Sequence, residues 1–260
     1  STAEIQQLYK QGGGKISKSP TGITTGLNTG LVGWWTFDGN SVKSGASGYA
    51  LDKSGNNYNA TATGAPVVKS GKIGQAMKFG SGNSLASANI TQLNSATKAT
   101  FSFWVKLSTL SATNRVMGVW GSSQNQMAVQ FENTNISVYV ASSLTDVGNN
   151  YCSMGGVAET GKWAHFVVVY DGAQSTNDTK LSIYKNGVKQ SVSCAGTIPA
   201  TLTNSSNGFN LATYTGLGSE LNGSIDDARI YNRALSTAEI SQLYKQGGGK
   251  ISKSPTNITT

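Results

Sequence analysis

The chain has a single histidine, only two cysteines and few charged residues for its length of 260 residues. Charged residues make up 12% of the sequence, about half of the roughly 25% that is average for soluble domains. Long amphipathic helices need Glu, Lys and Arg on the face that meets water, so few such helices are expected. The 32 glycines, with abundant Ser, Thr and Asn, are instead typical of turns. These shortages predict an all-β chain.

The net charge of +8 is not concentrated in one basic stripe. Residues 1–25 and 236–260 each carry three Lys and one Glu, so these two segments hold about half of it. A surface that follows nucleic-acid phosphates needs clustered basic residues, and no run of Lys or Arg lies between the two segments. No apolar stretch approaches the ~20 residues of a transmembrane helix. We expect neither a nucleic-acid partner nor membrane insertion.

The two ends of the sequence are near-identical copies, 1–25 and 236–260, offset by 235 residues. They differ at two positions, which are Gln6 against Ser241 and Gly22 against Asn257. Tandem repetition of a whole domain is the usual source of such identity, and duplication of the end segment alone is the alternative. We expect the neighbouring repeats to be partners, stacked head to tail.

Each copy begins with the pattern of a short helix. In the second copy Ser236 and Glu239 form an S-x-x-E capping box, and Ile240, Leu243 and Tyr244 follow at helical spacing. Glycines end the helix, and a polar linker containing proline follows. The resulting domain prediction is 1–11 closing helix of the preceding repeat, 12–28 linker, 29–246 domain, and 247–260 linker to the next repeat.

From Leu31 onward, short strand-like segments are separated by turn signals at intervals of roughly 8–15 residues, as in a β-sandwich. Apolar and polar residues alternate at 100–107 and at 127–132. The run 163–170 is nearly all apolar, which predicts a central strand covered on both faces. Asn186-Gly187 lies between two extended runs and predicts a hairpin. We expect a sandwich of two sheets with a short C-terminal closing helix.

Six motifs in this region carry a family resemblance. In order they are Gly33–Gly39 (GWWTFDG), Asp52–Asn57 (DKSGNN), Ala76–Gly80 (AMKFG), Phe101–Lys106 (FSFWVK), Trp163–Gly172 (WAHFVVVYDG) and Gly223–Leu235 (GSIDDARIYNRAL). Together they resemble the laminin-G-like, concanavalin A-like jellyroll superfamily over about residues 31–246. The resemblance implies two antiparallel sheets in a jellyroll, in a secreted or surface protein that binds sugars or proteins or acts as a spacer.

The candidate catalytic residues are few. His165 is the only histidine, and within an apolar strand we expect it to be a packed, hydrogen-bonded core residue rather than a base. Glycosidases need two carboxylates flanking the scissile bond. The one close pair, Asp226 and Asp227, alternates to opposite faces of a strand. We therefore predict that the chain is not an enzyme.

The resemblance also implies one structural Ca²⁺ that joins the first strand and nearby loops to the last strand. Calcium takes six to eight oxygen ligands, and the candidates are Asp38, Asn40, Asp226 and Asp227. In the alternative interpretation, Asp38 accepts turn amides and Asp227 pairs with Arg229. Asp52 is expected to form a turn.

Two tryptophans are candidates for a sugar-binding platform. Trp104 faces opposite to Phe103, and Trp120 precedes a polar loop, so both are expected to line a concave face. Covering of that face by loops is the alternative. Trp34 or Trp35, and Trp163, lie in apolar strands and are expected in the core.

Cys152 and Cys194 lie in segments rich in small polar residues, and no CxxC pair or zinc-like spacing occurs. One disulfide between neighbouring strands or loops is expected, and two free thiols are the alternative. The sequence thus predicts a non-catalytic extracellular tandem-repeat module of a surface fibre or adhesin, with a carbohydrate-binding module as the second hypothesis.

Overall fold

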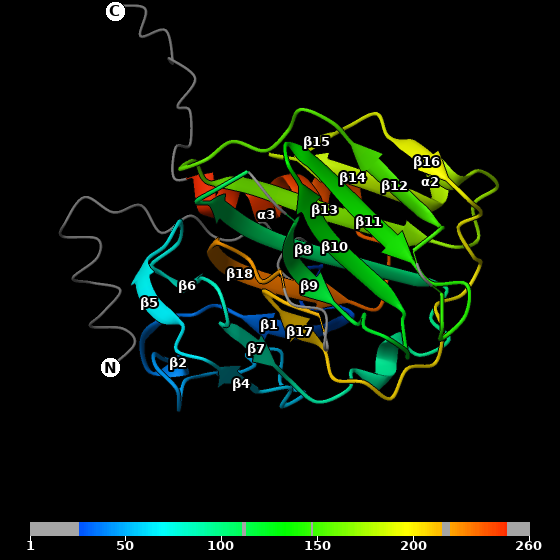
Figure 1. Ribbon diagram of the computed structural model, residues 1–260. Coiled ribbons are helices and arrows are strands. Elements are labelled where there is room, and N and C mark those ends of the chain that lie inside the picture. The colour runs from blue at the N-terminus through cyan, green and yellow to red at the C-terminus, as the bar shows by residue number, and fades with distance from the viewer. Residues whose placement is uncertain (1–25, 111–112, 147, 215–218, 249–260) are drawn as a thin grey trace, which may run out of the picture.

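The structure is a computed structural model that describes residues 26–110, 113–146, 148–214 and 219–248. Its strands form two antiparallel sheets that pack face to face (Figure 1), which confirms the predicted two-sheet sandwich with a C-terminal helix. No helix in these ranges is long and apolar enough to cross a membrane. The predicted segment 1–11, most of the predicted linker 12–28, and residues 249–260 of the predicted linker 247–260 lie outside the described residues.

The first sheet has eight strands in the order β15-β14-β13-β8-β18-β6-β5, with β1 also paired to β18. Its strands are β1 (Leu31–Trp35), β5 (Val67–Ser70), β6 (Gln75–Phe79), β8 (Lys98–Leu107), β13 (Ala164–Asp171), β14 (Leu181–Lys185), β15 (Val188–Lys189) and β18 (Gly223–Tyr231). The predicted apolar strand corresponds to β13, which is buried along its length between β14 and β8.

The second sheet has ten strands in the order β16-β12-β11-β10-β9-β17-β7-β4-β3-β2. They are β2 (Val42–Lys43), β3 (Tyr49–Ala50), β4 (Ala60–Thr63), β7 (Ser84–Ala86), β9 (Thr113–Gly118), β10 (Met127–Glu132), β11 (Asn135–Val140), β12 (Tyr151–Met154), β16 (Ser193–Ala195) and β17 (Asn210–Leu211). Within the described residues, four helices connect or follow the strands: η1 (Gly39–Ser41), η2 (Thr91–Leu93), α2 (Asn177–Lys180) and α3 (Thr237–Gly248).

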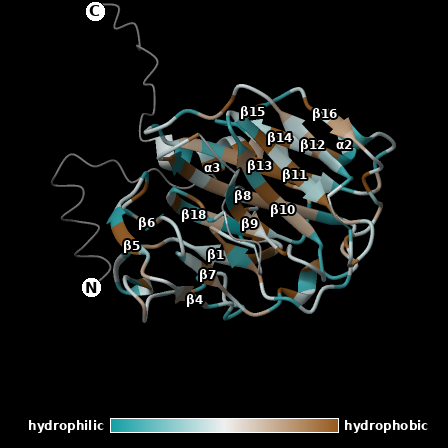
Figure 2. Cartoon of the chain, in the orientation of Figure 1, coloured by the Kyte–Doolittle hydropathy of each residue, from teal (hydrophilic) through white to brown (hydrophobic). Residues whose placement is uncertain are grey.

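The main core lies between the sheets. Alternation along β8 turns Phe101 and Phe103 inward. There the Phe166 ring contacts Phe131 of the other sheet edge-to-face, with ring centroids 5.2 Å apart. Figure 2 shows the hydrophobic residues concentrated on central strands such as β8, β10 and β13. Burial of such rings is the dominant favourable contribution to folding.

Helix α3 covers the outer face of the first sheet. Ile240 and Leu243 are fully buried there, in a cluster with Val167, Tyr184 and Tyr231. This explains why β8 and β13 are buried on both faces. The helix runs to Gly248, two residues beyond its predicted end, and its buried Gly247 packs against the ring of Trp104.

The N-terminus of α3 is closed by the predicted capping box. The backbone N–H of Ser236 donates to Glu239 (2.9 Å), and the N–H of Glu239 donates to the Ser236 hydroxyl (3.4 Å). Arg233 donates two further hydrogen bonds to Glu239, at 2.6 and 3.0 Å. These bonds to Arg233 hold the pKa of Glu239 down at about 2.

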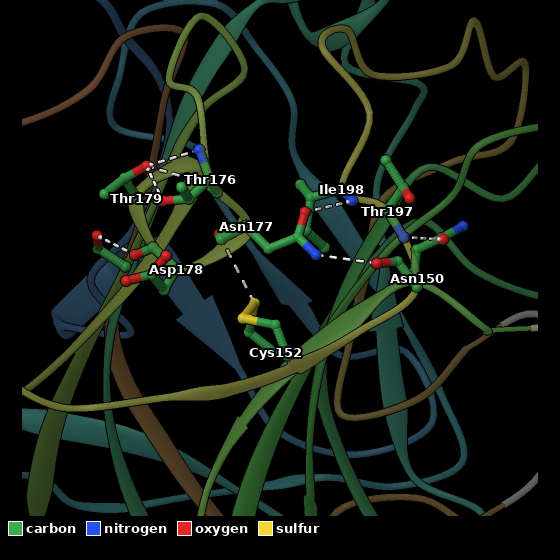
Figure 3. The surroundings of a disulfide bond; sticks show 11 residues. Asn150, Cys152, Thr176, Asn177, Asp178, Thr179, Thr197 and Ile198 are labelled. Carbon is green, nitrogen blue, oxygen red and sulfur yellow. Dashed lines mark hydrogen bonds between the residues drawn. A yellow bond between two sulfur atoms is a disulfide. The ribbon is translucent and has the colours of Figure 1, made fainter.

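Cys152 and Cys194 form the expected disulfide, between residues paired directly across β12 and β16. Figure 3 shows how neighbouring amides support this corner of the sheet. Asn177 accepts a hydrogen bond from the N–H of Ile198 (2.9 Å) and donates one to the carbonyl of Gly196 (2.9 Å). The disulfide thus joins β12 to β16, and the hydrogen bonds of Asn177 join the segment after β16 to α2.

We expect the double variant Cys152→Ser/Cys194→Ser to unfold with a free energy lower by about 4 kcal/mol, because the disulfide restricts a long loop in the unfolded chain. Urea denaturation of the oxidised wild type and the variant measures this difference. Reduced wild type is the control and should match the variant. Equal transition midpoints for all three proteins would contradict the expectation.

We expect Glu239→Gln to lower the free energy of unfolding by about 1 kcal/mol at pH 7, because it breaks the capping box and the Arg233 pair. The pKa of Glu239 is depressed in the folded state, so its stabilisation is present above the ordinary glutamate pKa and is lost as the pH falls toward 2. Denaturation at pH 7 and pH 2.5 should therefore show a clearly smaller difference at the lower pH. Glu159→Gln is the matched control, since Glu159 is exposed; an equal effect there would count against this explanation.

Candidate functional site

The outer face of the ten-stranded sheet carries a hollow of about 590 Å³ beside β4, β7 and β17. Small-molecule sites commonly measure about 300–1,000 Å³. The polar side chains that line it are hydroxyls, amides and one carboxylate: Thr63, Ser84, Ser87, Asn207, Asn210, Thr213, Tyr214 and Glu220. Such groups donate and accept hydrogen bonds in several directions.

Short side chains form the floor of the hollow. Leu85 points into the core, so Ser84 and Ala86 on either side of it point outward. Ala86 is paired with Asn210, and Asn210 with Gly118. Gly118 has a φ of 148°, and a Cβ there would lie 2.4 Å from the carbonyl oxygen of Met127. Short side chains therefore keep the outer surface over β7, β17 and β9 close to the backbone.

Tyr214 forms one wall of the hollow. The guanidinium of Arg115 lies 5.3 Å from the centroid of its ring, and the ring packs in a cluster with Trp120 and Ala128. Its hydroxyl is buried and, among the described residues, has no hydrogen-bond partner. Burial raises the pKa of Tyr214 well above its usual value, although the charge of Arg115 opposes this. The group is therefore a neutral donor beside the hollow.

Aromatic and polar residues continue across the same face. The ring of Tyr139 lies 5.8 Å from that of Trp120 and 5.3 Å from that of Tyr151. The carboxylate of Glu132 accepts hydrogen bonds from three neighbours, which are Gln130, Ser137 and Tyr139. Trp120, one of the two predicted platform residues, thus lies on this face, although its own side chain is largely buried at 8% exposure.

The second predicted platform residue, Trp104, lies on the other sheet. It faces outward from β8 as expected, but α3 covers it. The ring of Tyr244 stacks on it with centroids 5.7 Å apart, and its exposure is 2%. Trp104 therefore presents no ring face to a ligand in this structure. Trp35 is a core residue as expected, whereas Trp34 and Trp163 are half-buried.

His165 is the core histidine that its sequence position predicts. Its Nε2 lies 3.0 Å from the hydroxyl of Ser102, and the ring stacks near Trp104 and Tyr244. Burial and the nearby charge of Arg229 lower the pKa of His165 to about 3. A neutral, enclosed imidazole of this kind has no access to a substrate proton.

Two of the four predicted calcium ligands lie against the same turn, which joins β5 to β6. Asp226 accepts hydrogen bonds from the backbone N–H groups of Lys72 (2.7 Å) and Ile73 (2.8 Å), and Asp38 accepts one from Gln75 (2.7 Å). The second oxygen of Asp226, Oδ1, is buried without a hydrogen-bond partner in the described structure. Burial raises the pKa of Asp226 to about 7. A buried carboxylate oxygen that accepts no hydrogen bond is a suitable ligand for a cation.

The other two predicted ligands do not join this pair. Asp227 accepts hydrogen bonds from Arg229 (3.1 and 3.2 Å) and from the indole of Trp34 (2.6 Å), as the ion-pair alternative expected. Asn40 is exposed in η1. Within the described ranges, no three residues among His, Cys, Asp and Glu cluster as a metal centre. Asp52 forms a turn as predicted, accepting the N–H of Ser54.

The residues of the hollow were not singled out by the sequence. Ser84 and Glu220 are isolated polar residues in segments without a motif, and Tyr214 follows the short strand β17. They meet because β7 and β17 are adjacent in the sheet although distant in the chain. The only available signal was the alternation around Leu85, which indicates which side chains point outward.

A family model described as "Concanavalin A-like lectin/glucanases superfamily" matches residues 79–241. No curated protein sequence matches the chain.

Among solved structures, the receptor-binding domain of botulinum neurotoxin C/D mosaic serotype aligns with a TM-score of 0.62 and 18% identity, over 84% of this chain and 51% of that chain. The binding domain of Paraclostridial Mosquitocidal Protein 1 gives 0.62 and 15%, over 84% and 52%. Domain 4 of AbnA, an extracellular arabinanase from Geobacillus stearothermophilus solved with arabinotriose, gives 0.60 and 22%, over 82% and 98%. The chain spans about half the length of the two toxin domains. At these identities the likeness shows the fold.

Proposed function

The chain belongs to the concanavalin A-like lectin/glucanases superfamily, and on this premise we propose that it is a non-catalytic extracellular module that binds a neutral oligosaccharide at the hollow beside β7 and β17. The observation that carries the proposal is the polar lining of that hollow over a floor of short side chains. A sugar presents many hydroxyls, each of which donates and accepts hydrogen bonds, so it suits such a lining.

Particular groups in the hollow fit this ligand class. The half-buried carboxylate of Glu220 is a strong acceptor for sugar hydroxyls, because a charged acceptor makes stronger hydrogen bonds than a neutral one. The half-buried side chains of Asn207 and Thr213 add an amide and a hydroxyl to the same lining. AbnA domain 4, which shares the fold, was solved with arabinotriose, and a neurotoxin serotype D ligand-binding domain with N-acetylneuraminic acid. Both support a sugar as the ligand.

The extracellular location rests on the disulfide Cys152–Cys194, since such bonds persist outside the reducing cytosol. The lack of catalysis rests on the enclosure of His165 and on the engagement of the two adjacent carboxylates, because Asp226 accepts backbone N–H groups and Asp227 pairs with Arg229. The near-identical ends indicate a structural role within a repeat array. Such a role is compatible with sugar binding, because several weak sites on one array together bind more tightly than a single site.

We expect Glu220→Gln and Asn207→Ala each to weaken binding to a responsive oligosaccharide about tenfold, the effect of losing roughly 1.4 kcal/mol of hydrogen bonding. The wild type is first tested on immobilised neutral oligosaccharides that include arabinotriose, and the affinities are then measured by calorimetry. We expect no hydrolysis of the same sugars.

The matched control is Glu159→Gln, which removes a carboxylate beside the start of β13, outside the hollow. It should bind like the wild type. Equal loss in the control, or unchanged binding in both hollow variants, would contradict the site. Absence of binding to every sugar tested would contradict the function.

We further propose one structural Ca²⁺ held by Asp38 and Asp226, with backbone carbonyl oxygens completing the ligands. When bound it would neutralise the buried charge of Asp226 and fix the turn between β5 and β6 to β18. The unpartnered Oδ1 of Asp226 supports this assignment.

We expect Ca²⁺ to raise the melting temperature of the wild type by several degrees, because a ligand that binds only the folded state stabilises it. Asp226→Asn should abolish that increase, whereas Asp227→Asn should retain a Ca²⁺ response despite its lost ion pair. Differential scanning calorimetry with Ca²⁺ or with excess chelator measures both. Identical wild-type curves under the two conditions would remove the proposed ion.

A further inference from the structure

The contacts of α3 with the first sheet come from a small set of side chains. Ile240 and Leu243 are buried on the sheet, and Tyr244 stacks on Trp104. The side chain of Gln246 accepts a hydrogen bond from Arg229 (3.0 Å). The helix approaches most closely at Gly247, where a Cβ would lie 2.4–2.6 Å from atoms of the Trp104 ring. Only glycine fits at this point.

Each of these contact residues recurs at the other end of the chain. The corresponding residues at the N-terminal end are Ile5, Leu8, Tyr9, Gln11 and Gly12, and the capping pair recurs as Ser1 and Glu4. The one difference between 1–14 and 236–249 is Gln6 against Ser241, and position 241 makes none of the contacts above. The N-terminal segment lies outside the described residues.

We propose that the outer face of the first sheet under α3, lined by Trp104, His165, Val167, Tyr184 and Arg229, is an exchangeable docking surface whose second occupant is residues 1–12 of another copy of the chain. Because the contact residues are identical, exchange alters which chains are connected and leaves the contacts the same. This is the condition under which domain swapping is energetically cheap. The proposal is independent of sugar binding, which concerns the other sheet.

The contact between α3 and the docking surface contains polar groups that weaken it. Two polar atoms beneath α3, Nε1 of Trp104 and Nδ1 of His165, are buried and lack hydrogen-bond partners in the described structure. Unsatisfied buried groups weaken an interface, because water would satisfy them when the helix leaves. Docking of either copy therefore depends on its apolar side chains and on the fit at its glycine.

The chain enters the domain at the same face. Leu27 is buried in the cluster that holds Ile240 and Leu243, and Arg233 donates hydrogen bonds to the carbonyls of Gly26 and Thr29. Gly26, which follows residues 13–25 in the chain, therefore lies beside the docking surface. Thirteen extended residues span at most about 45 Å, long enough to reach a neighbouring molecule. Contacts of this kind are not self-complementary, so repeated exchange produces open chains of molecules.

The test compares substitutions at adjacent glycines of the full chain. Gly247→Val places a side chain against Trp104 and excludes α3, whereas Gly248→Val has open space around its Cβ and is the matched control. Sedimentation velocity over a range of concentrations should show association of Gly247→Val, while Gly248→Val remains like the wild type. Adding Gly12→Val to Gly247→Val should abolish the association.

A synthetic peptide of residues 1–14 gives a second measurement, which holds even if the double variant is poorly folded. The peptide should raise the melting temperature of Gly12→Val/Gly247→Val, and the same peptide carrying Gly12→Val should not. A monomeric Gly247→Val would overturn the proposal, because the spare segment would then not dock in trans. Association that persists in the double variant, or a peptide without effect, would also overturn it.

Discussion

The last strand, β18, holds the molecule together, because it contacts elements from both ends of the sequence. It pairs with β8 and β6 in the middle of one sheet and with β1 from the start of the domain. Its carboxylates extend these links: Asp226 binds the turn between β5 and β6, and Asp227 binds the indole of Trp34. The register shifts between Asp226 and Arg229, so the strict alternation expected from the sequence is not kept at this pair, and each carboxylate binds a different partner.

The two sheets differ in what covers their outer faces, and this difference separates the proposed functions. The first sheet carries a helix, so its outward residues Trp104 and His165 are as buried as a core. The second carries no such layer within the described residues, and its outward residues are polar or aromatic around an open hollow. The proposed sugar-binding surface and the proposed helix-docking surface therefore lie on different sheets, and either can be altered without the other.

The buried polar groups mark where the structure departs from a simple sandwich. Asp226 Oδ1, Trp104 Nε1 and the Tyr214 hydroxyl each lack a partner in the described structure, and an unsatisfied buried group is costly. Each lies beside a feature with a proposed occupant: the cation, the exchanged helix and the sugar. The apolar core between the sheets thus stabilises the fold. The unsatisfied polar groups, which destabilise it, lie at the surfaces where binding is proposed.

The sequence by itself determined the fold class, the closing helix, the central strand β13, the disulfide and the core role of His165. Those features depend on local alternation, on capping residues, or on residue types that have few alternative roles. Only the tertiary structure decided that Trp104 lies under α3 and that Asp227 pairs with Arg229 rather than joining Asp38. It also assembled Ser84, Tyr214 and Glu220 into one hollow. These outcomes depend on which strands become neighbours and on what covers each face, and strand order is set by long-range packing that no local pattern records.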